Sequence, residues 1–164
     1  MVIFIAAICL CIMGCTIAFG FTLINKPKIN KIDYSKADAI RIESGRSLPP
    51  GSPSNFSLQI TKENIFYLST DNGGEIYDSK NESINSIEFE QILQMLDTHT
   101  IYHPKTVNEG IKGCTGGTSY SIEVKSSGQT LFNGYRYECG VKVDSDIAGN
   151  LVNFINDVKL FLND

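Results

Sequence analysis

Two stretches near the C-terminal end of the chain decide the fold: Thr118–Lys125 reads TSYSIEVK and Thr130–Tyr137 reads TLFNGYRY. In the first stretch every second residue is apolar or aromatic, which is the period of a strand with one buried face. The second stretch is rich in aromatic and other β-favouring residues. Between them Ser126–Gln129 (SSGQ) supplies turn residues, including a glycine that tolerates a left-handed conformation. The two stretches therefore predict an antiparallel β-hairpin.

Further strands are predicted upstream of this hairpin. Ala37–Ser44 (ADAIRIES) alternates at period two, and Phe56–Lys62 and Asn64–Thr70 read as two strands with a tight connection. A turn then leads to a short strand at Glu75–Asp78. The intervening stretch Gly45–Asn55 contains three prolines and two glycines, so it is expected to be an exposed loop.

Two helices are predicted from their start signals and apolar spacing. Asn85 and Glu88 have the spacing of a capping box, and the helix that they begin is expected to end near Thr98. A final helix is predicted to begin at Ser145 or Asp146, since both residue types favour a helix N-terminus. Its apolar stripe consists of Ile147, Leu151, Phe154, Ile155, Val158 and Leu162.

The order of these elements indicates an α+β fold. Grouped strands with few intervening helices predict an antiparallel sheet of about five strands with two helices packed on one face. The chain of 164 residues is expected to contain one soluble α+β domain, residues 37–164, after a linker at residues 25–36. Residues 1–24 form a separate N-terminal transmembrane or signal segment.

The N-terminal segment Val2–Ile24 (VIFIAAICLCIMGCTIAFGFTLI) is apolar and uncharged throughout. As a helix its 23 residues would extend roughly 34 Å, enough to cross a hydrocarbon core of about 30 Å. A cleaved export signal usually has a basic start and a shorter apolar region, and the basic start is missing here. The sequence therefore predicts attachment to a membrane through residues 2–24, with an uncleaved anchor favoured over a signal peptide.

One motif inside this segment offers a different mode of attachment. Ile12-Met13-Gly14-Cys15 resembles the lipobox of bacterial lipoproteins. The resemblance implies cleavage before Cys15 and lipidation of that cysteine. The residues that follow are apolar, whereas lipoproteins usually continue with polar residues. The alternative is that Cys9, Cys11 and Cys15 are small apolar residues of a membrane helix.

The two cysteines of the soluble domain, Cys114 and Cys139, flank the predicted hairpin. If its turn is centred near residues 126–128, the position opposite Cys114 falls at about 139–141. A disulfide between them is therefore predicted, and it would persist only in an oxidising compartment. The alternative is two reduced thiols in the cytoplasm, which Lys26, Lys28 and Lys31 favour through the positive-inside rule. We favour export, with the domain on the periplasmic or extracellular side of the cell membrane.

Composition and motifs argue against several functions. The net charge is −4 without a basic cluster, which argues against binding of nucleic acid. His99 and His103 stand four apart but lack the glutamate of an HExxH motif and a third ligand, so no metal is expected. Gly110–Thr118 is glycine-rich, but it lacks the ending of a P-loop. Cys114 could act as a nucleophile only with a free thiol, which the disulfide excludes. The sequence predicts neither catalytic residues nor a cofactor.

The best candidate for a binding surface is the aromatic cluster of the second hairpin arm: Phe132, Tyr135, Arg136 and Tyr137. Tyrosine and arginine are enriched at interface hot spots, and one face of an antiparallel sheet can remain exposed. Alternate members of the cluster are expected to pack beneath the C-terminal helix instead.

These observations favour a membrane-tethered, non-enzymatic exported domain that binds another protein, such as a periplasmic inhibitor or immunity protein. One alternative is an accessory structural subunit of a cell-envelope complex. Another is a hydrolase whose catalytic residues form no recognisable motif.

Overall fold

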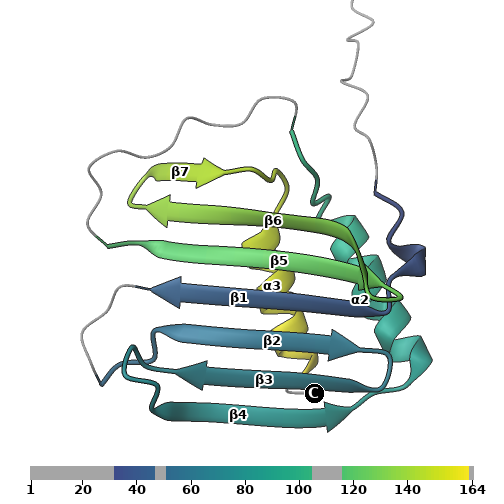
Figure 1. Cartoon of the computed structure of the whole chain (residues 1–164), viewed down its shortest axis with the longest axis horizontal. Coiled ribbons are helices and arrows are strands. Elements are labelled where there is room, and N and C mark those ends of the chain that lie inside the picture. Colours follow the sequence, from purple (N-terminus) through teal and green to yellow (C-terminus); the bar gives the residue numbers. More distant parts are fainter. Residues whose placement is uncertain (1–31, 47–50, 105–115, 163–164) are drawn as a thin grey trace, which may run out of the picture.

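Strand β1 (Ala39–Arg46) lies at the centre of a seven-stranded antiparallel sheet of order β4-β3-β2-β1-β5-β6-β7 (Figure 1). The computed structural model describes residues 32–46, 51–104 and 116–162. The other strands are β2 (Asn55–Thr61), β3 (Asn64–Thr70), β4 (Ile76–Ser83), β5 (Thr118–Ser126), β6 (Gln129–Cys139) and β7 (Lys142–Ser145). The short 3-10 helix η1 (Tyr34–Lys36) and the helices α2 (Ser86–Thr98) and α3 (Leu151–Phe161) complete the described elements.

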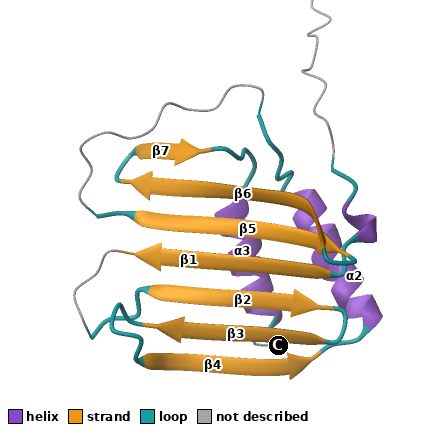
Figure 2. Cartoon of the chain, viewed as in Figure 1, coloured by secondary structure: helices purple, strands orange, loops and turns teal. Residues whose placement is uncertain are grey.

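Both α-helices lie against the same face of the sheet (Figure 2). Ile42 of β1 stands directly between Leu58 of β2 and Ile122 of β5, and all three are at most 1 % exposed. Full burial of one such aliphatic side chain stabilises a fold by about 1.5–3 kcal/mol. The helices contribute the other side of this core, with buried Phe89, Ile92, Leu93, Leu96, Leu151, Phe154, Ile155 and Val158. Alternation along each strand then directs the intervening residues to the opposite face.

Helix α2 begins with the predicted capping box. The Asn85 side chain accepts hydrogen bonds from the backbone N–H groups of Ile87 and Glu88, and Glu88 accepts one from the N–H of Asn85 at 2.7 Å. The helix ends at Thr98, as expected. The prediction for this helix is therefore confirmed at both ends.

The predicted α+β class is confirmed, but the strand count of about five is wrong, since the sheet has seven strands. Strand β4 extends to Ser83 instead of ending at Asp78. Most of its residues are exposed, and no apolar residue follows Tyr77 in it, so its sequence lacks the apolar residues from which the other strands are predicted. The short strand β7 was not predicted at all, because it has four residues and only one of them is apolar.

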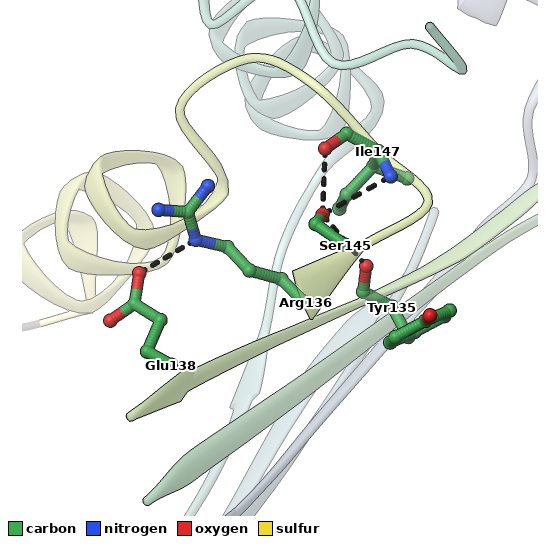
Figure 3. A network of polar contacts seen from close by, with 5 residues as sticks. All are labelled: Tyr135, Arg136, Glu138, Ser145 and Ile147. Carbon is green, nitrogen blue, oxygen red and sulfur yellow. Dashed lines mark hydrogen bonds and ion pairs between the residues drawn. The ribbon is translucent and has the colours of Figure 1, made fainter. Parts of the chain in front are cut away.

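The predicted start of the final helix is also wrong, since α3 begins at Leu151 rather than near Ser145. Ser145 ends β7, and its hydroxyl lies 2.7 Å from the carbonyl oxygen of Ile147 and 3.0 Å from that of Tyr135 (Figure 3). Asp146 accepts a hydrogen bond from the N–H of Tyr135 instead of capping a helix. Both polar side chains therefore hold the loop against β6.

The described part of the predicted linker belongs to the domain. Tyr34 is 5 % exposed, and its hydroxyl donates to the carbonyl oxygen of Ile101 at 2.9 Å. Burial, with Asp97 nearby, raises the pKa of Tyr34 above its usual value. No helix among the described residues is long and apolar enough to cross a membrane. The predicted segment 2–24, with Cys15, lies outside the described residues, so membrane attachment stays a prediction.

A prediction follows from the close approach of Gly134 in β6 to Ile147. A Cβ atom on Gly134 would lie 2.1 Å from Cγ2 of Ile147, whose side chain is buried in the core. Gly134→Ala should therefore lower the free energy of unfolding by about 1–3 kcal/mol, measured by urea denaturation.

The matched control is Gly45→Ala in β1, whose added Cβ would meet only the side-chain ends of Asn55 and Ser119 at 3.3 Å. It should leave stability unchanged or raise it by up to about 1 kcal/mol. The double variant Gly134→Ala with Ile147→Ala should lose less unfolding free energy than the two single variants lose together, because removing the Ile147 side chain makes room for the added Cβ. Equal stability of the Gly134→Ala and Gly45→Ala variants would contradict this packing.

Candidate binding surface

The face of the sheet opposite α2 and α3 bears no helix among the described residues and is here called the uncovered face (Figure 2). It carries a groove with a volume of about 480 Å³. Across its middle runs a row of directly opposed residues from five adjacent strands: Leu68, Ser57, Glu43, Ser121 and Tyr135. At a strand spacing of about 4.8 Å, the backbones of the two end residues are roughly 19 Å apart. The groove therefore has one aliphatic wall, one aromatic wall and a wide floor between them.

Small residues make the floor low. Ser57 and Ser121 flank Glu43, and in the next row Gly45 stands between Asn55 and Ser119. The Ser119 hydroxyl donates to the Gly45 carbonyl oxygen at 3.1 Å. These short side chains leave space that longer strand residues would fill, and they present hydroxyl groups at the bottom of the groove.

The aromatic wall is fixed in place by polar contacts. Tyr135 is 41 % exposed, its hydroxyl donates to Asp144 at 3.2 Å, and its N–H donates to Asp146 at 2.6 Å. Burial and the bond to Asp144 raise the pKa of Tyr135, so the phenol remains protonated at neutral pH. Tyr137, on the same face, donates its hydroxyl to the carbonyl oxygen of Gly116 at 2.7 Å. These bonds hold the rings before any ligand arrives.

The structure divides the predicted cluster between the two faces of β6. Tyr135 and Tyr137 lie on the uncovered face, opposite Ser121 and Ser119. Phe132 is 4 % exposed and belongs to the core, so it cannot form part of an exposed surface here. Arg136 lies on the helix side and forms an ion pair with Glu138 at 2.6 Å (Figure 3). Alternate members do lie on opposite faces, because neighbouring residues of a strand point to opposite sides. The rings next to Phe132 are those of Tyr34 and His103, so packing of this cluster beneath the C-terminal helix stays a prediction.

The other groove residues were not recognised in the sequence. Leu68, Ser57, Gly45 and Ser119 form no motif, and they come from four different strands. Only the register of the sheet brings them together. The nearest indication was the exposed-face alternation of the hairpin arm Thr118–Lys125, which places serines at two successive outward positions.

Asp71, just after β3, supports one rim of the groove. Its carboxylate accepts backbone N–H bonds from Gly73 at 2.7 Å, Glu75 at 2.9 Å and Gly51 at 3.2 Å. These bonds, that from Glu75 most of all, lower the pKa of Asp71. The Asn55 amide in turn donates to the Asp71 carbonyl oxygen at 3.1 Å. Asp71 thereby joins the Gly51 segment to the strand end that borders the groove.

The two histidines lie on the helix side of the sheet and do not meet. Nε2 of His99 is 2.8 Å from Asp157, which joins the end of α2 to α3. Nδ1 of His103 is 2.8 Å from the carbonyl oxygen of Asp146, and its ring lies against Phe132. Within residues 32–46, 51–104 and 116–162, no group of three His, Cys, Asp or Glu residues could hold a metal ion. The expectation of a metal-free protein stays a prediction.

Cys139 is the last residue of β6, whereas Cys114 lies outside the described residues. The register of the hairpin differs slightly from the predicted one, because Thr118 pairs with Glu138. Continuing it by one step places Gly117, rather than Cys114, opposite Cys139. The disulfide between Cys114 and Cys139 therefore stays a prediction, and the strand register alone does not supply it.

A second, larger cleft of about 750 Å³ lies between η1 and α2. It is lined by Tyr34, Leu93 and three acidic residues, Asp33, Glu90 and Asp97. Ile32, where the described chain begins, also lines this cleft, so the described residues do not define its outer side. The groove on the uncovered face is bordered by strands throughout and is the better-defined candidate.

Comparisons with protein-family models, with curated proteins and with solved structures found no match for this chain. The geometry of the uncovered face is therefore the basis for inferring a function. Its main elements are the row from Leu68 to Tyr135 and the supported rim at Asp71.

A second prediction concerns Asp71 and pH. Its lowered pKa means that the carboxylate stabilises the fold above its unfolded-state pKa of about 3.9, and that this contribution is lost as the pH falls through the folded-state pKa. Asp71→Asn should therefore lower the urea midpoint at pH 7, and the difference from wild type should shrink at pH values below about 4.

Asp78→Asn on exposed β4 is the matched control and should leave the midpoint nearly unchanged at both pH values. If the difference in urea midpoint between wild type and Asp71→Asn stayed constant down to pH 2, the charge of Asp71 would not be what stabilises the rim of the groove.

Proposed function

We propose that this chain is a membrane-tethered, exported binding protein that holds a protruding segment of another protein on the uncovered face of its sheet. The observation that carries the proposal is the groove between Leu68 and Tyr135, in a sheet whose opposite face is covered by two helices. An antiparallel sheet can stay stable with one face open, because its core lies on the other side. The open face is then available for recognition.

The walls and the floor of the groove would make different contributions to binding. Tyr135 offers a large ring already held by Asp144 and Asp146, and such pre-ordered aromatic residues contribute strongly to interfaces. The hydroxyl groups of Ser57, Ser119 and Ser121 can donate and accept hydrogen bonds with a partner's backbone or polar side chains. We infer that the preferred segment inserts an aromatic or aliphatic side chain between the walls.

Two pairs of opposite charges lie on the uncovered face in and beside the groove. Arg41 bonds to Glu43, and Lys125 bonds to Glu123 at 3.0 Å. Burial and the bond to Asp144 raise the pKa of Tyr135, so the phenol of the aromatic wall stays neutral. Paired charges and a neutral phenol suit binding better than acid–base chemistry, which needs a group with a pKa near the working pH. Affinity should accordingly depend little on salt concentration.

The proposed N-terminal tether determines where the domain would meet its partner. Residues 2–24 would hold the domain at the cell membrane, either as an uncleaved anchor or through lipidated Cys15. Export would place the groove in the periplasm or outside the cell. The partner that we propose there is an exported enzyme, and the domain would act on it as an inhibitor or immunity protein.

A photo-crosslinking amino acid at Ser121 in the groove tests the proposal in the full-length chain in its host membrane. The crosslinked protein is identified by mass spectrometry, purified and titrated against the full-length chain. The same probe at Gln59, exposed on the uncovered face but outside the groove, is the matched control. The proposal expects a discrete protein adduct from Ser121 and none from Gln59. Equal adducts from both positions, or none from Ser121, would refute it.

Filling the groove should abolish binding of that partner. Gly45→Leu places a side chain over the floor, where the adjacent atoms are flexible side-chain ends, so the strand should still form. We expect Gly45→Leu to weaken binding at least tenfold and Gln59→Leu to change it less than twofold, measured by calorimetry. Unchanged affinity of a folded Gly45→Leu variant would exclude the groove as the binding site.

A further inference from the structure

Strand β4 forms one edge of the sheet, and its outer side has no neighbouring strand among the described residues (Figure 1). We propose that this edge pairs with β4 of a second copy of the chain, so that two sheets join into one continuous antiparallel sheet. The proposal is independent of the partner on the uncovered face. It rests on the direction of the backbone groups and on the charge pattern of the strand.

The hydrogen bonds to β3 determine which backbone groups point outward. The N–H of Ile84 donates to the carbonyl oxygen of Glu63, so residues 63 and 84 form a hydrogen-bonded pair in register with Asn64 and Ser83. Because such pairs alternate along an antiparallel ladder, Glu82 and Lys80 also direct their backbone groups toward β3. The N–H and C=O groups of the intervening residues therefore face outward at the edge. These residues are Ser79, Asn81 and Ser83.

Two copies related by a two-fold axis perpendicular to the sheet would pair these outward groups. With Asn81 opposite Asn81 of the second copy, Ser79 stands opposite Ser83, and all three positions form hydrogen-bonded pairs. Lys80 then stands opposite Glu82 of the second copy, and the symmetry repeats this contact. Lys80 and Glu82 of the second copy form a non-hydrogen-bonded pair, in which the Cα atoms are about 4.5 Å apart and the side chains are close together. The proposed seam thus contains two reciprocal contacts between opposite charges.

The same charges disfavour the neighbouring registers. A shift that places Lys80 opposite Lys80 also places Asp78 opposite Glu82, so every charged pair becomes repulsive. A further shift places Lys80 opposite Asp78, but it brings the irregular pairing at Thr70 and Ile76 into the seam. Charged residues on an edge strand usually prevent unspecific pairing. Here their order permits one regular register.

The surroundings of Lys80 are compatible with this contact. Lys80 is half-buried on the helix side of β4, and its ammonium group lies 3.5 Å from the carbonyl oxygen of Leu162. An ammonium group carries three donors and can contact more than one acceptor. The opposite edge strand, β7, has only four residues and offers a shorter ladder. The longer edge is therefore the one suited to self-association.

Charge-reversal variants of the full-length chain test the seam. Two differently tagged forms are purified in excess detergent micelles and mixed, and capture of one tag measures the other. Wild type should associate with itself, whereas Lys80→Glu alone and Glu82→Lys alone should each associate about tenfold more weakly. A mixture of Lys80→Glu chains with Glu82→Lys chains should recover the wild-type capture, since each seam contact is again between opposite charges.

Asp78→Lys is the matched control for Glu82→Lys, because it makes the same charge change on the same face of β4. Mixed with Lys80→Glu, it should give no more capture than the wild-type chain mixed with Lys80→Glu, because residue 78 faces no charged residue in the seam and one of the two seam contacts remains repulsive. Three results would overturn the proposal: a wild-type chain that does not self-associate, equal capture for all charge combinations, or recovery with Asp78→Lys in place of Glu82→Lys. Because the N-terminal segment is identical in every variant, association through that segment cannot produce the predicted pattern.

Discussion

The burial of one face of the central strands is the constraint on which the rest of the structure depends. Ile42 of β1 is enclosed between Leu58, Ile122 and the helices, and it has no exposed surface. Since strand side chains alternate, burying Ile42 forces Arg41 and Glu43 onto the other face. A register shift of one residue would bury these charges, which is far more costly than losing any single contact in the sheet.

The sequence predicts best those elements whose structure depends on residues close to one another in the chain. The capping box of Asn85 and Glu88 predicts the start of α2, and the stretch Asn64–Thr70, tightly connected to the strand before it, predicts β3 with its observed bounds. The start of α3 could not be found in this way. Ser145 and Asp146 are residue types that favour a helix start. Here, however, both side chains form hydrogen bonds with the backbone of Tyr135, which lies ten and eleven residues earlier in the chain. A tertiary contact replaces the local preference there.

The candidate site was predictable only in part, for a related reason. Tyr135 stands out in the sequence because it is a large aromatic residue in a clear strand. Leu68, Ser57 and Ser121 do not, because they acquire a role only when five strands align in register. Small polar residues also occur on the solvent-exposed faces of many strands. Their presence in the sequence therefore does not distinguish a groove floor from ordinary surface. The groove is therefore a property of the sheet, not of any segment.

The two proposed interfaces occupy different parts of the sheet and are compatible. The groove spans β3 to β6 on the uncovered face, whereas the seam uses the outer edge of β4. A two-fold axis perpendicular to the sheet would keep both uncovered faces on the same side of the joined sheet. Two grooves would then face the same direction, which would strengthen binding to a partner with two matching segments.

An aspartate scan of β5 tests most directly whether only one face of the sheet is covered. Ile122→Asp and Val124→Asp would place a carboxylate beneath the helices, whereas Ser119→Asp and Ser121→Asp would place it on the uncovered face. The free energy of unfolding should therefore fall sharply at residues 122 and 124 and change by no more than about 1 kcal/mol at residues 119 and 121, where the aspartate at 121 stands opposite Glu43. A similar loss at all four positions would mean that the second face is also buried, and it would contradict the account.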